Sequence, residues 1–399
     1  MKIIRSLFAA ASLLALVSPL HAAEPKLTLK ENDVWVMSGD SITAQRQYTN
    51  YIEAYYHTRS PNLNLRFRNS GIGGNRTGNI LARFDYDIAA WKPTIVSVEL
   101  GMNDVGNGDD PAAYIQGMRD IIAKIRAIPA QPVLISSSPV DDGSKMGDWK
   151  SDRCKRLDAY IVALRKLAEE EKVVFVDQYH PLVDLWGDNR RKGEAEAVKK
   201  GTWPPKPTPA PAVDPAKPAK PAAPPIAPSL IPLTGDTVHP GPVGQYTMAA
   251  TILAGLGAEK EVSSATLKAD GSVVAAKHCK ITGASASGGK LSFTRLDESS
   301  PWPILPAAKS AATLDASELA AGWNITSAYD SAVGDRATKI LGLIYNLQVK
   351  LNNDWRAASK DKNAEKLAEA QKAVDAADAE IRAACAPAVW KFEIEKDAK

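Results

Sequence analysis

The sequence predicts an α/β fold built on a parallel sheet with helices on both faces. From Asp33 to about Gly257, short apolar runs rich in β-branched residues alternate with longer segments whose apolar residues recur at helical spacing. Continuous apolar runs are typical of strands that are buried on both faces, as in parallel sheets. The expected strands are residues 34–37, 65–67, 95–98, 133–135 and 173–176.

The segments between these strands carry the apolar stripes of amphipathic helices. The stripes are Tyr51-Ile52-Tyr55-Tyr56, Ile80-Leu81-Phe84-Ile88, Tyr114-Met118-Ile121-Ile122-Ile125 and Leu157-Ile161-Leu164-Leu167. In sheets of this kind, functional groups lie beyond the carboxyl ends of the strands, near the point where the strand order reverses. Residues that follow these strands are therefore the first candidates for a functional site.

The N-terminus has the pattern of a secretory signal peptide. Two cations precede an apolar stretch from Leu7 to Leu20, and the small residues Ala22 and Ala23 follow it. We therefore expect residues 1–23 to be removed and the mature protein to be secreted or periplasmic. No later stretch approaches the ~18 apolar residues of a membrane span, so we expect no integral membrane segment.

Charge and cysteine content exclude several kinds of protein and site. Removal of the signal peptide leaves 47 of the 49 basic residues against 46 acidic ones. This balance does not support nucleic-acid binding or electrostatic attachment to a membrane. Cys154, Cys279 and Cys385 permit at most one intramolecular disulfide. No Cys-x-x-Cys or His-x-x-x-His spacing occurs, so we expect neither a metal site nor another cofactor.

A proline-rich segment interrupts the alternation after Trp203. Residues 204–232 contain twelve prolines and no glycine, with Pro-Ala-Lys repeats at the centre. Polyproline II is the regular structure that this composition supports, and it offers no side chains for a core. We interpret the segment as a solvated insertion whose two ends return to the same domain. A docking arm for cell wall or for a proline-recognising partner is the alternative.

The region after Gly257 differs from the α/β part. Residues 258–336 contain short alternating runs separated by Gly and Ser turns, which predict a small β element. Residues 337–399 read as helical, with one amphipathic stripe and a seven-residue repeat. These positions are Ile340-Leu341-Ile344-Leu347-Leu351 and Leu367-Val374-Ile381. We expect a helical hairpin folded against the body, and dimerisation is the alternative use of these faces.

Four short motifs follow an expected strand or precede an expected helix. Gly39-Asp40-Ser41-Ile42 ends the first strand and places Ser41 on a strand-to-helix turn, where backbone amides can stabilise a developing negative charge. The others are Asn69-Ser70-Gly71-Ile72-Gly73-Gly74-Asn75-Arg76-Thr77, Gly101-Met102-Asn103-Asp104 and Gly235-Asp236-Thr237-Val238-His239-Pro240. Because of these positions, all four can converge on one edge of the sheet.

This set resembles the GDSL/SGNH hydrolases, a family of serine esterases, lipases and carbohydrate deacetylases. The resemblance covers roughly residues 33–257 of an expected hydrolase domain over residues 24–257, and it departs at Ile42, where the family name has leucine. It implies a flavodoxin-like three-layer α/β/α sandwich. It also implies a catalytic Ser41, His239 and Asp236, with an oxyanion hole formed by the backbone amides of Ser41 and Gly74 and by the side-chain amide of Asn103.

Elementary chemistry favours the same nucleophile and base. A serine hydroxyl is a poor nucleophile until an imidazole takes its proton. His239 follows Asp236 by three residues, so a turn can bring the carboxylate to the ring and fix its tautomer. His180, which follows the last expected strand, is the alternative base, and His57 on an aromatic helix face is expected to be structural. Gly-x-Ser-x-Gly is absent, which argues against an α/β-hydrolase nucleophile elbow.

Three other polar residues of the motifs have expected roles. Surroundings that are neutral and poor in acceptors would leave the amide of Asn103 free to face a substrate oxygen. Asp40 is expected to brace its turn without taking part in the reaction. Arg76 is expected to be solvated at a helix entry, with pairing to a substrate anion as the alternative.

The expected function is hydrolysis of carboxylic esters through an acyl-enzyme, on a small-molecule or polysaccharide substrate. A polar, nearly neutral composition and the lack of a long apolar lid segment favour small acyl groups on carbohydrate, such as acetyl esters. A lipase or lysophospholipase of the same family is one alternative. A non-catalytic envelope-binding protein on the same fold is another.

Overall fold

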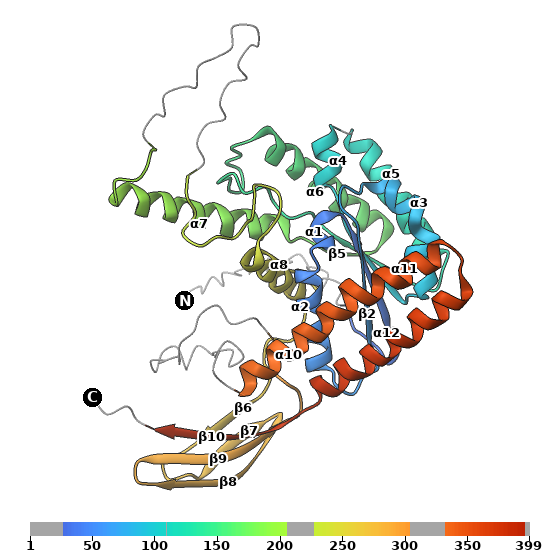
Figure 1. Ribbon diagram of the computed structural model, residues 1–399. Helices are drawn as coiled ribbons and strands as arrows, with labels where there is room; N and C mark the ends of the chain where they lie inside the picture. The colour runs from blue at the N-terminus through green and yellow to red at the C-terminus, as the bar shows by residue number, and fades with distance from the viewer. Residues whose placement is uncertain (1–26, 109, 206–226, 304–331, 396–399) are drawn as a thin grey trace, which may run out of the picture.

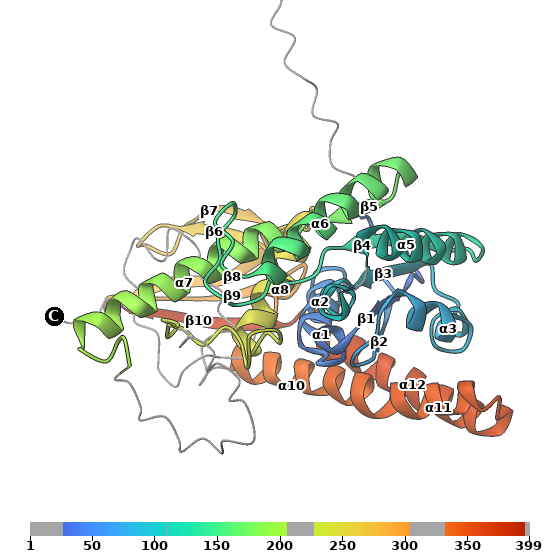
Figure 2. The same cartoon turned by 90° about the horizontal axis from the view of Figure 1, so that it is seen from above.

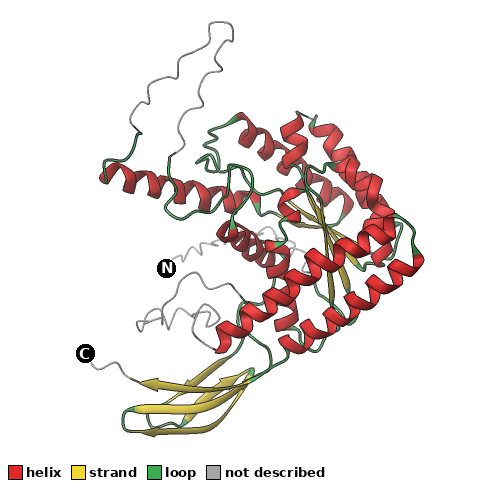
Figure 3. Ribbon diagram, in the orientation of Figure 1, coloured by secondary structure: helices red, strands yellow, loops and turns green. Residues whose placement is uncertain are grey.

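The computed structural model describes residues 27–108, 110–205, 227–303 and 332–395 (Figure 1). The expected signal peptide and most of the proline-rich insertion lie outside these residues, as does part of the expected β-containing region. The described residues form a central sheet with helices around it, smaller sheets at one end and a C-terminal helical region (Figure 3).

The central sheet is parallel throughout and has the strand order β2-β1-β3-β4-β5. The strands are β1 (Val34–Gly39), β2 (Arg66–Gly71), β3 (Ile95–Glu99), β4 (Gln131–Ile135) and β5 (Val174–Val176). This is the flavodoxin-like order, in which the direction of winding reverses between β1 and β3. Residues that follow β1 and β3 therefore lie together at the point of reversal.

Helices cover both faces of this sheet, which confirms the predicted three-layer fold (Figure 2). One face carries α2 (Gln47–Arg59) and α8 (Pro242–Gly255), which pack on each other. The other carries α3 (Thr77–Asp87), α5 (Pro111–Arg126) and α6 (Asp152–Glu171), packed in that order. The predicted stripes face inward, since Ile52, Ile80, Met118 and Leu164 are fully buried. The helical spacing of apolar residues thus predicted helices on both faces of the sheet.

Two parts of this domain differ from the prediction. The helix α7 (Tyr179–Lys199) was not expected, because charged residues interrupt its apolar spacing. The strand β2 begins at Arg66 and continues through Asn69 and Ser70, which were expected in the following loop. Polar residues form a strand here because the C-terminal helices supply hydrogen-bonding partners along the β2 edge. Short helices also occur at α1 (Ser41–Ala44), η1 (Ala89–Trp91) and α4 (Met102–Asn107).

The C-terminal helices pack against α2, α3 and the edge strand β2 (Figure 2). α10 (Ala332–Asn346), the π-helical segment η3 (Leu347–Leu351) and α11 (Asn352–Lys360) run on from one another, and α12 (Ala364–Cys385) returns beside them. The predicted apolar positions Ile344 and Ile381 are fully buried. Arg68 of β2 and Asp378 of α12 form a buried ion pair with an Nη2–Oδ2 distance of 2.6 Å. The expected hairpin is therefore present and folded against the body.

The predicted β element is built from two distant parts of the chain. β6 (Ser264–Leu267) pairs with β7 (Val273–Lys277), and β8 (Cys279–Ser287) pairs with β9 (Lys290–Asp297). The last strand, β10 (Val389–Glu395), pairs antiparallel with β9. The helical prediction for 337–399 is therefore wrong over 389–395. In this short strand Phe392 packs against Phe293 of the neighbouring strand β9. This contact stabilises the strand and forms only in the folded chain, so the local sequence did not predict it.

The described part of the chain also bears on the cysteines, on membrane-spanning helices and on metal sites. Cys154, Cys279 and Cys385 all lie within it and are free thiols. Over the same ranges, no helix is long and apolar enough to cross a membrane. No group of three or more His, Cys, Asp or Glu side chains among the described residues is arranged to hold a metal ion.

The C-terminal helices pack closely on the body, so we expect a cavity beneath α10 to lower the free energy of unfolding strongly. Ile344 is fully buried, whereas its neighbour Tyr345 is 54% exposed. Ile344→Ala should lower the free energy of unfolding by about 2–5 kcal/mol, because a buried side chain is lost and leaves a void. Tyr345→Ala is the control and should cost far less. Urea unfolding measures both, and equal losses would contradict the packing described here.

Candidate active site

Ser41 is the first residue of α1, and Asp40 alone separates it from the end of β1. Two glycines allow the close packing that this sharp turn requires. A Cβ at Gly39 would lie 2.0 Å from Thr43 Oγ1, and a Cβ at Gly71 would lie 2.4 Å from the nitrogen of Ala44. A larger residue at either position would push α1 away from the strand ends and displace Ser41.

His239 lies in a tight turn before α8. The Gly235 amide donates to the His239 carbonyl at 3.0 Å, which closes the turn. Asp236 Oδ1 accepts hydrogen bonds from the amides of Val238 and His239, both at 2.7 Å. Partial burial acts to raise the pKa of Asp236, but these amides and the His239 ring outweigh it and lower the pKa to about 2. The carboxylate is therefore ionised at neutral pH.

The fold brings Ser41, His239 and Asp236 into one hydrogen-bonded row. Ser41 Oγ lies 2.9 Å from His239 Nε2, and His239 Nδ1 lies 2.9 Å from Asp236 Oδ2. Ser41 and His239 are 198 positions apart, so their contact results from the fold. The side chains of His239 and Asp236 are 36% and 60% exposed, so this site opens directly to solvent.

The other histidines considered from the sequence lie outside this row. His180 also follows an aspartate by three residues, and its Nδ1 lies 2.6 Å from Asp177 Oδ2. Its Nε2 lies 2.9 Å from Asp158 Oδ1, so both ring nitrogens are engaged away from Ser41. The hydrogen bond to Asp177 raises the pKa of His180, which favours the imidazolium. His57 is buried within α2, as expected of a structural residue.

The loop after β2 lies beside Ser41. A Cβ on Gly73 would come within 3.9 Å of Ser41 Cβ. Gly74 is exposed and has a φ of +73°, in the left-handed region that favours glycine. Arg76 is half-buried at the start of α3, where its backbone amide donates to Asn79 Oδ1 at 2.9 Å. The loop thus carries the Gly74 amide close to the candidate nucleophile.

Asn103 approaches from α4, just after β3. Its Nδ2 donates to Asp40 Oδ2 at 3.0 Å and to the Asn75 carbonyl at 3.2 Å. The expectation of surroundings poor in acceptors is therefore wrong. The buried carboxylate of Asp40 needs donors, and Asn103 is one of them. An oxyanion at this site would have to share one of these N–H groups or take it over.

Asp40 braces its turn, as expected. The side chain is fully buried and caps α1 by accepting a hydrogen bond from the Ile42 amide at 2.9 Å. Burial raises the pKa of Asp40 to about 6; the Ile42 amide opposes this shift, and the charge of Asp104 adds to it. A titratable group with a raised pKa thus lies directly beneath Ser41.

Two residues that hold the histidine turn were not predicted. Asp141 donates its backbone amide to the Thr237 carbonyl at 2.9 Å, and its buried carboxylate accepts from Thr234 Oγ1 at 2.8 Å. Arg190 of α7 donates to the same carboxylate, with an Nε–Oδ1 distance of 2.8 Å. No motif marks either residue. Its position in the sequence could have indicated Asp141, because this residue follows β4 at the sheet edge where the four motifs converge.

Residues 37–196 match the model of the GDSL-like Lipase/Acylhydrolase family. The chain carries a GDSL-like lipase/acylhydrolase domain. Three of the four motifs lie within the matched residues of this GDSL-like domain. The turn that contains Asp236 and His239 lies beyond them, so its place in the site rests on the geometry described above.

Individual relatives of the GDSL-like domain include an acetylxylan esterase from Geobacillus stearothermophilus. It is 25% identical over 140 residues, which are 33% of this chain and 62% of that protein, so the chain spans less than two thirds of this relative. A solved structure of an acetylxylan esterase from the same organism covers 58% of this chain and 98% of its own, with 21% identity and a TM-score of 0.42.

A further similar structure is that of a gut microbial diltiazem-metabolizing enzyme. The similarity covers 94% of this chain and 100% of the other, with 20% identity and a TM-score of 0.68. At this identity the similarity concerns the fold alone. The shared fold extends well beyond the GDSL-like domain.

The raised pKa of Asp40 predicts a pH-dependent contribution to stability. Its folded-state value of about 6 exceeds the usual 3.8, so around pH 5 the folded protein binds a proton that the unfolded chain releases. This contribution is fully present below about pH 4 and is lost as the pH rises through about 6. The Tm of Asp40→Asn relative to wild type should therefore increase between about pH 4 and 7.

Ser41→Ala is the control for this measurement, because it alters the same turn and keeps Asp40. Its Tm should follow the wild-type pH course. A difference between Asp40→Asn and wild type that stays constant over the range would contradict the raised pKa.

Proposed function

We propose that this protein is a serine esterase that cleaves carboxylic esters through an acyl-enzyme. The observation that carries the proposal is the row of 2.9 Å contacts from Ser41 Oγ to His239 Nε2 and from His239 Nδ1 to Asp236 Oδ2. It joins a hydroxyl, a base and an orienting carboxylate in the order that nucleophilic catalysis requires. The GDSL-like domain that contains Ser41 supports the same reaction class.

In this mechanism Ser41 Oγ attacks the ester carbonyl while His239 Nε2 accepts the hydroxyl proton. Asp236, ionised and bound to Nδ1, holds the tautomer that leaves Nε2 free to accept, and it stabilises the imidazolium. His239 then gives the proton to the leaving alcohol, and the acyl group remains on Ser41. Water, deprotonated by His239, attacks the acyl-enzyme and releases the acid and the free serine.

The tetrahedral intermediates require hydrogen-bond donors for the negative oxygen. We assign this role to the backbone amides of Ser41 and Gly74 and to Asn103 Nδ2. The proximity of Gly73 to Ser41 supports the role of the Gly74 amide. Asn103 would share with the oxyanion one of the N–H groups that it now donates to Asp40 and to the Asn75 carbonyl. Each such donor is worth about 3 kcal/mol of transition-state stabilisation.

The proposed substrate class is an acetyl ester of a carbohydrate. The similarity to an acetylxylan esterase supports this class. The half-exposed His239 and the exposed Gly74 support it further, because the site leaves room for a bulky, polar alcohol to remain in solvent. We also propose that the protein is exported, on the signal-peptide pattern of residues 1–23.

Substitutions in the triad should reduce turnover of a small acetyl ester in a defined order. Ser41→Ala and His239→Ala should each lower kcat by about 10³-fold or more. Asp236→Ala should cost less, because its 60% exposed position lets water take over part of its role. Initial rates on 4-nitrophenyl acetate measure the series.

A fluorophosphonate probe supplies the matched test of the nucleophile. Wild type should be labelled at Ser41, Ser41→Ala should not be labelled, and His239→Ala should be labelled much more slowly. A folded wild-type chain that neither labels nor turns over ester would exclude the esterase and favour the binding protein.

The acyl-chain profile separates a deacetylase from a lipase. Rates on 4-nitrophenyl esters should fall from acetate to longer chains, because an open, polar site offers little apolar surface to a long acyl chain. Release of acetate from acetylated xylan is the second measurement. A steep preference for long chains would contradict the deacetylase and identify a lipase.

A further inference from the structure

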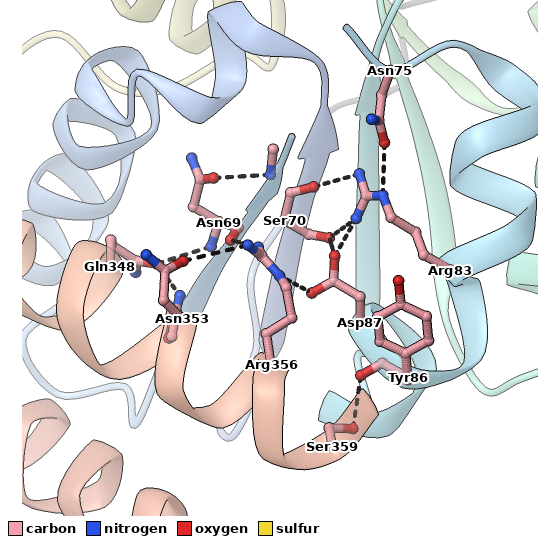
Figure 4. Close-up of polar contacts among 12 residues, drawn as sticks. Asn69, Ser70, Asn75, Arg83, Tyr86, Asp87, Gln348, Asn353, Arg356 and Ser359 are labelled. Atoms are coloured by element: carbon pink, nitrogen blue, oxygen red, sulfur yellow. Dashed lines mark hydrogen bonds and ion pairs between the residues drawn. The ribbon is translucent and has the colours of Figure 1, made fainter. Parts of the chain in front are cut away.

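A chain of buried polar contacts joins the C-terminal helix α11 to the GDSL-like domain (Figure 4). It begins at Arg356, whose Nε donates to Asp87 Oδ1 at 2.5 Å and whose Nη2 donates to the Asn69 carbonyl at 3.1 Å. The side chains of Arg356 and Asp87 are 16% and 1% exposed. One guanidinium of α11 therefore holds both the end of α3 and the polar part of β2.

Arg83 continues this chain toward the site. It lies one turn before Asp87 on α3 and forms an ion pair with Asp87 Oδ2. Its Nε donates to Asn75 Oδ1 at 2.9 Å, and its Nη2 donates to the Ser70 carbonyl at 2.6 Å. The Arg83 side chain is 5% exposed, so these charge-assisted hydrogen bonds are shielded from water.

Asn75 is where the chain reaches the reacting groups. It directly follows Gly74, and its carbonyl accepts the hydrogen bond from Asn103 Nδ2 at 3.2 Å. A shift of Asn75 would therefore move two of the three proposed oxyanion donors together. Donors of this kind stabilise the transition state only when they are held in place before the reaction.

We propose that Arg356 is a positioning residue for the active site. Acting through Asp87 and Arg83, it fixes Asn75 and so aligns the Gly74 amide and Asn103. This inference rests on the proposed esterase function. It makes the C-terminal helical region a part of the catalytic unit, although Arg356 itself does not touch the reacting atoms.

The geometry separates this role from simple support of the fold. Without Arg356, the Arg83–Asp87 ion pair within α3 would remain. Ser70 Oγ would also still donate to Asp87 Oδ2 at 2.8 Å. What would be lost is the partner of Oδ1, which fixes the rotation of the carboxylate and so the orientation of Arg83. α11 also has a separate contact to α3, from Ser359 Oγ to the Tyr86 carbonyl at 2.8 Å, which does not lead to the site (Figure 4).

The first test compares Arg356→Met with the matched control Ser359→Ala on 4-nitrophenyl acetate. Arg356→Met should lower kcat about ten- to hundredfold, because small displacements of catalytic donors are costly, while KM changes by less than about threefold. Ser359→Ala should retain wild-type kcat, even if its Tm falls. Arg356→Lys should recover part of the rate, because an ammonium can still bind Asp87.

A double-mutant cycle tests the route of the coupling. Asn75→Ala removes the acceptor of Arg83, so Arg356→Met should add less than about twofold to its loss of kcat. A full, multiplicative loss in the double variant would show that Arg356 acts by general stabilisation and would overturn the proposal.

Hydrogen exchange over residues 72–76 measures positioning without reference to turnover. Exchange should be faster in Arg356→Met than in wild type and unchanged in Ser359→Ala. If wild type proves inactive while this difference is present, the proposed function fails, and the coupling of Arg356 to residues 72–76 is still established. Unchanged exchange and unchanged kcat in Arg356→Met, with Ser41→Ala inactive, would overturn the positioning role and leave the esterase intact.

Discussion

Gly39 and Gly71 leave no room for a side chain between the ends of β1 and β2 and the helix α1. This close approach is the constraint on which the site depends. It turns the chain sharply enough for Ser41 to emerge at the sheet edge beside the loop of Gly73 and Gly74. The reversal of strand order between β1 and β3 then adds Asn103 from the other side.

Such a turn buries polar groups, and each of them needs a hydrogen-bonding partner, because an unpaired polar group in the protein interior destabilises the fold. Asp40 is satisfied by the Ile42 amide and by Asn103. Along β2 the partners come from outside the GDSL-like domain: Gln348 Oε1 accepts from the Asn69 amide at 2.9 Å, and Asp378 pairs with Arg68. The C-terminal helices thus complete the polar interior of the domain that they cover.

The sequence predicted the parts of this structure that follow a local rule. Buried strands and helical stripes located the sheet and its layers, and motifs at strand ends located Ser41, His239 and their neighbours. The missed parts depend on contacts between distant segments. No spacing links Arg356 to Asp87 or Arg190 to Asp141. Asp177 and His180 share the spacing of Asp236 and His239, so this spacing by itself does not separate the two pairs. The contact of His239 with Ser41 does.

The strand β10 also has a consequence for how the chain is made. It pairs Val389 with Leu296, so the sheet of β8, β9 and β10 is completed only after the chain has been synthesised through residues 389–395. Closing so long a loop costs conformational entropy, which the contacts of the sheet offset only after they have formed. The completion of this sheet is therefore a late step of folding. Until then the edge of β9 that β10 covers has no partner, and an unpaired strand edge is a place where other chains can pair.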